Sequence, residues 1–70
     1  MSNNRKGGIV MDYIISLSDG RYFCGWDTLD GSMKFRTERA LAYRMRRPVA
    51  TTTLAKILGA THVDCKIEHL

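Results

Sequence analysis

The chain is poor in the residues that define several classes of small protein. Its 70 residues contain two cysteines, Cys24 and Cys65, too few for the disulfide framework of a small secreted domain. No run approaches the roughly 18 apolar residues of a membrane span. The apolar stretch near the N-terminus is interrupted by Asp12 and lacks the cleavage pattern of a signal peptide. We therefore expect a cytoplasmic protein with reduced thiols and no membrane contact.

Motifs for catalysis and metal binding are also lacking. The sequence has no glycine-rich phosphate-binding loop, and His62 and His69 do not stand in a Cys/His cluster with metal-site spacing. Cys24 could act as a nucleophile with His62 as its base only if their strands were adjacent, and a small buried thiol is the simpler interpretation. We predict no catalysis, no cofactor and no metal. Whether Cys24 and Cys65 pair with each other stays open.

Composition and length indicate one globular domain. The hydrophobic fraction of 44% is normal for a folded chain. Residues 1–9 are polar and Gly-rich, so we predict a disordered tail followed by a single domain over residues 10–70, and Met11 could be an alternative start. A domain of this size buries only about 60% of its unfolded surface. Its stability is therefore marginal, and both a monomer and a homodimer are compatible with it.

Two Asp-Gly pairs separate three predicted strands. Asp19-Gly20 predicts a hairpin, because a type I′ turn needs positive φ at both central residues, and Asp30-Gly31 predicts a second turn. Within the second strand, alternation places Tyr22, Cys24 and Trp26 on one face and Phe23 on the other, and Gly25 indicates a bulge or a close backbone approach. The predicted strands are Val10–Leu17, Arg21–Asp27 and Ser32–Arg36.

A helix is predicted from Glu38 to Arg46 or Arg47. Thr37 is a good N-cap, and Pro48 disfavours helical geometry in the residue before it. Arg46 and Arg47 would then lie at the negative end of the helix dipole, where positive charge is stabilising.

The remaining residues predict a second helix and a last strand. Thr51, Thr52 or Thr53 would cap a short helix that contains Leu54, Ala55, Ile57 and Leu58 and ends at Gly59. The alternating run His62–Glu68 predicts a strand with Val63, Cys65 and Ile67 facing inward. The expected fold class is α+β, an antiparallel sheet of three to four strands with two short helices on one face, in the order β-β-(β)-α-α-β. Its expected core comprises Tyr13, Ile15, Leu17, Leu41, Met45, Leu54, Ile57, Leu58, Val63 and Ile67.

Positive charge is concentrated between Lys34 and Arg47, where six basic residues accompany one acid, Glu38. On a helix that turns about 100° per residue, the basic residues and an aromatic would share an outer face, which favours an anionic partner. The alternative is that the arginines only solvate that face. The predicted partner-binding residues are Arg36, Arg39, Tyr43, Arg46 and Arg47. A secondary candidate surface comprises Arg21, Tyr22 and Trp26, although core packing of at least two of the neighbouring aromatics Tyr22, Phe23 and Trp26 is the simpler interpretation.

The run YIISLSDGRYFCGWD followed by MKFRTERAL resembles a loose group of short proteins encoded by phages and other mobile elements, some of which are anti-CRISPRs. The shared elements are Asp19-Gly20, Tyr22, Gly25-Trp26, Phe35, Thr37, Ala40 and the strand His62–Glu68. This resemblance implies a non-catalytic inhibitor in the host cytoplasm that docks through its basic helix on a host protein or a nucleoprotein complex, in competition with nucleic acid.

A second resemblance covers residues 13–47. Three strands followed by a helix, with tyrosine in the second strand, are similar to the arm-type DNA-binding domain of phage integrases. That resemblance implies a DNA- or RNA-binding module whose sheet enters the major groove. Here the charge lies mainly on the predicted helix and the last strand is additional, so nucleic-acid binding is the alternative function.

Overall fold

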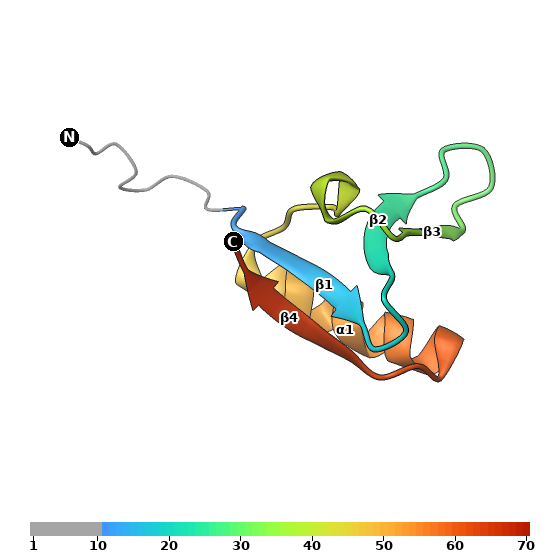
Figure 1. Cartoon of the computed structure of the whole chain (residues 1–70). Helices are drawn as coiled ribbons and strands as arrows, with labels where there is room; N and C mark the ends of the chain where they lie inside the picture. The colour runs from blue at the N-terminus through green and yellow to red at the C-terminus, as the bar shows by residue number, and fades with distance from the viewer. Residues whose placement is uncertain (1–10) are drawn as a thin grey trace.

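The computed structural model describes residues 11–70, which form a four-stranded sheet with one α-helix packed against one face (Figure 1). In chain order the elements are β1 (Tyr13–Leu17), β2 (Tyr22–Trp26), β3 (Met33–Arg36), the short 3₁₀-helix η2 (Arg39–Leu41), α1 (Arg47–Thr61) and β4 (Cys65–His69). The predicted α+β class and antiparallel sheet are confirmed, whereas the prediction of two helices is wrong. The predicted tail over residues 1–9 lies outside the described residues.

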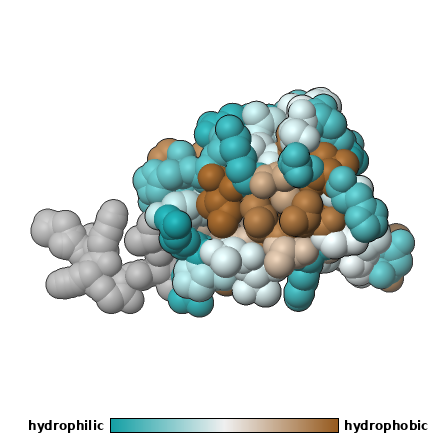
Figure 2. All heavy atoms as spheres, turned by 90° about the horizontal axis from the view of Figure 1, so that it is seen from below, coloured by the Kyte–Doolittle hydropathy of each residue, from teal (hydrophilic) through white to brown (hydrophobic). Residues whose placement is uncertain are grey.

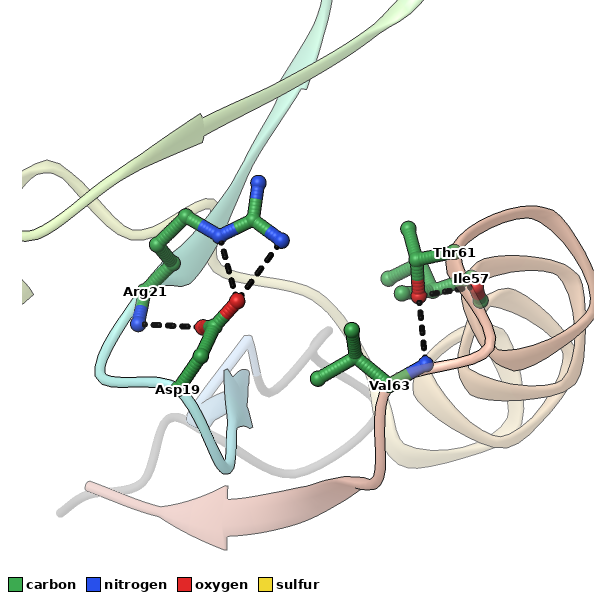
Figure 3. Close-up of polar contacts among 5 residues, drawn as sticks. All are labelled: Asp19, Arg21, Ile57, Thr61 and Val63. Carbon is green, nitrogen blue, oxygen red and sulfur yellow. Dashed lines mark hydrogen bonds and ion pairs between the residues drawn. The ribbon is translucent and has the colours of Figure 1, made fainter.

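Both predicted Asp-Gly turns are present, and the aspartates hold them. The Asp19 carboxylate accepts hydrogen bonds from the backbone N–H of Arg21 at 3.1 Å and from its Nε at 2.8 Å (Figure 3). The Asp30 carboxylate accepts one from the backbone N–H of Ser32 at 2.9 Å. Gly20 and Gly31 each have a positive φ, but the predicted type I′ conformation of Asp19-Gly20 is wrong, because His62 is the one non-glycine residue with a positive φ among residues 11–70. The turns therefore fix where β1, β2 and β3 begin and end.

The core lies between the inner face of the sheet and α1. The predicted inward direction of β1 is confirmed, because Ile15 and Leu17 are buried and Tyr13 packs against them. Met45 is buried as predicted, but Leu41 and Leu58 are exposed. The buried cluster comprises Ile15, Leu17, Phe23, Met45, Ala50 and Ile57.

The predicted facing of β2 is wrong at Trp26, which was expected on the face opposite Phe23. Phe23 has no exposed surface and points into the core, and Trp26 lies on its side of the strand with the two ring centroids 5.0 Å apart. The register with β3 shifts between Phe23 and Trp26, where Gly25 has a φ of 99°. A bulge was one of the two alternatives that Gly25 indicated, and it adds the residue that returns Trp26 to the face of Phe23.

The segment predicted as the first helix is mostly extended. After the single turn of η2, Tyr43 donates its N–H to the carbonyl of Phe23 at 2.9 Å. Met45 and Tyr13 then exchange two backbone hydrogen bonds of 2.9 and 3.2 Å. The segment thus lies between the diverging strands β1 and β2, whose register contains only Ser16↔Tyr22. Pairing with two strands outweighs the helix propensity of the arginines.

α1 starts earlier than the predicted second helix. Pro48 lies in its first turn, where a missing N–H is harmless, so this proline begins a helix and does not end one. The threonines expected as caps lie inside the helix. Thr51 donates its hydroxyl to the carbonyl of Arg47 at 3.1 Å, and Thr52 donates to that of Pro48 at 3.3 Å.

α1 also ends later than predicted, since it continues through Gly59. His62 supplies the left-handed residue, with a φ of 58°, and donates its N–H to the carbonyl of Leu58. The Thr61 hydroxyl donates to the carbonyl of Ile57 at 2.8 Å and accepts from the N–H of Val63 at 3.2 Å (Figure 3). The predicted last strand accordingly starts at Cys65, because His62 belongs to the helix end.

β4 joins the sheet along β1 in five residue pairs, from Tyr13↔His69 to Leu17↔Cys65. The sheet order is β3-β2-β1-β4, so β3 and β4 are its edges. Cys24 on β2 and Cys65 on β4 lie on opposite sides of β1 and are not paired. No helix within residues 11–70 is long and apolar enough to cross a bilayer.

Candidate functional site

Four arginines gather where β1 begins, β4 ends and α1 begins. Arg39 pairs with Glu68 of β4, with Nη2 and Oε1 3.3 Å apart. The Arg47 guanidinium lies 5.8 Å from the ring centre of Tyr13, close enough for a cation–π contact. Arg46 is the N-cap residue of α1, and Arg44 borders a hollow of about 230 Å³ that Ile14 and Leu70 also line. We call this group, Arg39, Arg44, Arg46 and Arg47, the arginine end.

The arginine end is not the helix face predicted from the sequence. Arg39 begins the 3₁₀-helix η2, Tyr43 and Arg46 lie on the extended segment after it, and Arg36 is on β3 opposite Tyr22. Convergence comes from tertiary structure, because the bridge between Tyr13 and Met45 brings the residues before α1 to the start of β1.

The positive charges of the arginine end lie at the N-terminus of α1, where the helix dipole favours negative charge. The N-terminus of α1 carries the positive end of the helix dipole, and its first turn contains no acidic residue. Arg46 makes no side-chain capping bond there. The ion pairs among residues 11–70 are Arg21–Asp19 and Arg39–Glu68. Within the described part of the chain, Arg44, Arg46 and Arg47 therefore have no carboxylate partner, and an external anion would relieve their repulsion.

Glu68 is tied into this end of the molecule. The Ser16 hydroxyl and then the Arg39 guanidinium hold the pKa of its carboxyl below the ordinary value of 4.5. Glu68 therefore stays ionised at neutral pH and fixes Arg39 over the outer face of the sheet. The segment around Arg39 covers that face, which explains why Ile14 is only 1% exposed although it points away from α1.

An aromatic cluster adjoins the same segment. The rings of Phe23, Trp26 and Tyr43 are mutually inclined by 78–80°, with centroids 5.0–6.0 Å apart. A Cβ at Gly25 would lie 3.2 Å from Cδ1 of Tyr43, so only glycine lets this ring approach the strand without displacement. Trp26 is 40% exposed and Tyr43 is 42% exposed, whereas Phe23 is buried beneath them. The structure thus unites Tyr43 with Trp26, which the sequence assigned to separate surfaces.

The other residues of the predicted secondary surface lie apart from Trp26. Arg21 pairs with Asp19 at 2.8 Å, and its guanidinium lies 5.0 Å from the ring centre of Phe35. Tyr22 is half-buried and opposite Arg36. Arg21 is therefore satisfied by its own hairpin.

A groove separates Trp26 from the first half of α1. Its volume is about 390 Å³, and Val49, Thr52 and Lys56 line it together with Pro48 and Thr53. Sequence reasoning missed Val49 and Lys56 as site residues. The available signal was Pro48, because a proline in the first helical turn would have placed the following residues on a helix beside the arginines.

The cysteines have quieter environments. Burial raises the pKa of Cys24 and of Cys65, and their thiols donate to the carbonyls of Tyr22 at 3.3 Å and Leu54 at 3.8 Å. Within residues 11–70 no three His, Cys, Asp or Glu side chains gather as potential metal ligands.

Comparisons with known proteins found no matching family model, no matching curated protein and no matching solved structure.

Proposed function

We propose that this protein is a non-catalytic binding protein that docks on an anionic surface of a macromolecular partner. The observation that carries the proposal is the set of Arg44, Arg46 and Arg47 around the positive end of α1 without a carboxylate partner among the described residues. Such an arrangement is unfavourable in the isolated protein, and a bound anion would stabilise it. Arginine is suited to the task because its planar guanidinium binds carboxylate and phosphate groups bidentately.

The partner we propose is a host defence nucleoprotein, which the protein inhibits in the manner of a small phage anti-CRISPR. The resemblance to short phage proteins motivates this partner. The structure adds a surface of suitable composition, because Trp26 and Tyr43 are exposed and in contact, and Trp26 borders the groove with Pro48 in the first turn of α1. Tryptophan, tyrosine and arginine are the residues that most often dominate binding at protein interfaces.

Two observations make a nucleic-acid module the weaker alternative. The rings of Trp26 and Tyr43 are inclined by 78°, so they do not form a parallel platform for successive bases. The segment that contains Arg39 and Arg44 lies against the outer face of β1, where an integrase-like domain would need an open sheet. DNA binding is therefore an outcome that the experiment must detect.

The test is a double variant, Arg46→Glu with Arg47→Glu, used as bait in a nuclease-treated bacterial lysate and in a gel shift with duplex DNA. We expect the parent to capture a protein and the double variant to bind it at least tenfold more weakly, because reversed charges at a docking face are repulsive. The variant should also unfold at higher temperature. Each acid placed near the N-terminus of α1 is worth about 0.3–1 kcal/mol, which reverses the effect expected if these arginines ended a helix.

Lys34→Glu with Arg36→Glu on β3 is the matched control, since it makes the same charge change away from the arginine end. Loss of capture in both double variants would mean that only net charge matters and would contradict the site. A salt-sensitive DNA shift without protein capture would favour the nucleic-acid module. Equal capture by the parent and by the arginine variant would overturn the proposed site.

A further inference from the structure

β4 is an edge strand whose outer side is unpaired within residues 11–70. The backbone carbonyl of Asp64 accepts a hydrogen bond from the N–H of Ser18 at 2.7 Å, and the N–H of Leu70 donates to the backbone carbonyl of Asp12 at 2.7 Å. Because hydrogen-bonded pairs alternate along an antiparallel ladder, the even-numbered residues of β4 direct their backbone groups toward β1. The odd-numbered residues direct theirs outward. The residues with outward N–H and C=O groups are Cys65, Ile67 and His69.

The side chains of β4 are complementary to a second copy of the same strand. Lys66 and Glu68 flank Ile67 and point to the face of the sheet away from α1. When two copies pair antiparallel with Ile67 opposite Ile67, Lys66 lies opposite Glu68 of the second copy, and the twofold axis repeats this pair. The same register places the outward backbone groups of Ile67 in a hydrogen-bonded pair. Lys66 and Glu68 then fall in the non-hydrogen-bonded pairs, where opposing side chains come closest.

The inner side of this edge is apolar. Cys65 and Ile67 are only half-buried although they belong to the core side of β4, and Leu54 of α1 packs beside them. Leu58, one helical turn further along α1, is 43% exposed. On the side where β4 and α1 lie at the bottom of Figure 1, the surface shows apolar side chains bordered by hydrophilic ones (Figure 2). A second copy paired along β4 would extend over these side chains and remove them from water.

We infer that two copies of this chain form a dimer by antiparallel pairing of their β4 strands about Ile67, which joins two four-stranded sheets into one continuous sheet. In this one register the outward backbone groups form hydrogen bonds, Lys66 faces Glu68 twice, and the exposed apolar side chains beside β4 are covered. This interface is isologous and closes with two copies. Of the residues in this interface, Glu68 also pairs with Arg39 of the arginine end, but the inference does not depend on the proposed function.

The experiment measures mass by sedimentation and light scattering across micromolar to millimolar concentrations. The parent should move toward twice its 8.0 kDa monomer mass as concentration rises. Lys66→Glu alone and Glu68→Lys alone should each raise the dissociation constant roughly tenfold or more, because both cross-strand pairs become repulsive. An equimolar mixture of the two variants should dimerise again, since an acidic strand then faces a basic one. Lys56→Glu is the matched control, because it makes the same charge change on the groove side of α1.

Circular dichroism establishes that each variant is folded before its mass is measured. The inference is overturned if the parent stays monomeric at every concentration, or if either single variant dimerises like the parent. Mixed variants that remain monomeric would also overturn it, because the Lys66–Glu68 register predicts their rescue. Open-ended growth beyond a dimer would exclude a contact that closes on itself. Unchanged dimerisation of Lys56→Glu supports the interface, and its loss would contradict it.

Discussion

The two edge strands of the sheet have similar sequences but different charges, since β3 carries two positive residues and β4 carries one of each sign. The centre of β3 reads Lys34–Arg36 around Phe35, and the centre of β4 reads Lys66–Glu68 around Ile67. Antiparallel self-pairing about the central residue would oppose two positive charges on β3 and unlike charges on β4. β3 is also shorter, and its ladder with β2 contains a bulge. Charge, length and bulging are the usual protections of an edge strand. β3 combines charges of one sign, a short strand and a bulged ladder, whereas β4 is longer, pairs with β1 without a register shift and carries charges of both signs.

The largest effect on stability is expected from replacing Gly25, the glycine at the bulge that distinguishes the β3 edge from the β4 edge. Gly25→Ala is expected to lower the free energy of unfolding by about 2–4 kcal/mol, because an L-residue is strained at positive φ and the new methyl overpacks a ring. The φ of 99° and the 3.2 Å approach to Tyr43 locate both causes. Urea unfolding followed by tryptophan fluorescence measures the loss.

Gly20→Ala is the control for that prediction. Gly20 also has a positive φ of 94°, but a Cβ there would meet nothing within 4 Å. Its expected loss is about 1–2 kcal/mol, from backbone strain alone. Equal losses at the two positions would show that Tyr43 does not press on the bulge.

A smaller effect is expected from the acid that distinguishes β4. Glu68→Gln should lower the free energy of unfolding by about 0.5–1.5 kcal/mol at neutral pH, since it weakens charge-assisted hydrogen bonds. The groups that face this carboxyl are Ser16 on β1, Arg39 before α1 and Lys66 on its own strand.

The effect of Glu68 should depend on pH in one direction. A carboxyl whose pKa is lower in the folded state than in the unfolded state adds stability above its unfolded value. That contribution disappears as the pH falls below about 4.5 and through the lowered pKa of Glu68. Thermal melts of dilute protein should therefore show the parent and Glu68→Gln converging in acid. A gap that stays constant down to low pH would contradict this role of the charge.

The smallest effect is expected on the other edge. Lys34→Glu gives β3 an acid–apolar–base pattern like that of β4, with the signs exchanged. Because β3 is short and its ladder with β2 is bulged, we expect association through β3 to gain no more than about 1 kcal/mol. Light scattering at high concentration would show a slight rise in average mass. Extensive polymerisation would mean that repulsion between Lys34 and Arg36 was the main protection of this edge.

Much of the sheet could be predicted because its signals are local. Asp19 and Asp30 bond to their own turns, and the alternation of Cys65 and Ile67 depends only on adjacent positions. The facing of Trp26 was wrong because strict alternation, which places Trp26 opposite Phe23, takes no account of the extra residue at the bulge. A bulge at Gly25 was one of the predicted alternatives, but its consequence, the move of Trp26 to the side of Phe23, was not predicted.

The segment before α1 could not be predicted, because tertiary hydrogen bonds decide its structure. Arginines, alanines and a leucine favour a helix in isolation, whereas Tyr43 and Met45 are held by β2 and β1. Pro48 is compatible with the end of one helix or the start of the next. Arg46 and Arg47 were therefore predicted at the negative end of a helix dipole, whereas the structure has them at the positive end of α1. The composition of the proposed site was therefore visible in the sequence, and its geometry was not.

The pairing of β1 with β4 also imposes an order on biosynthesis. β1 emerges from the ribosome early, but its most extensive partner is complete only at His69. Until then the nascent chain can form the β1–β2 turn while the edge of β1 that later receives β4 stays without its partner. Contacts this distant in sequence form slowly, because closing the intervening loop costs chain entropy. During translation, β1 therefore stays an unpaired apolar segment that contains Ile14, Ile15 and Leu17 until β4 is made. A stalled or truncated chain would leave this segment accessible to chaperones and proteases.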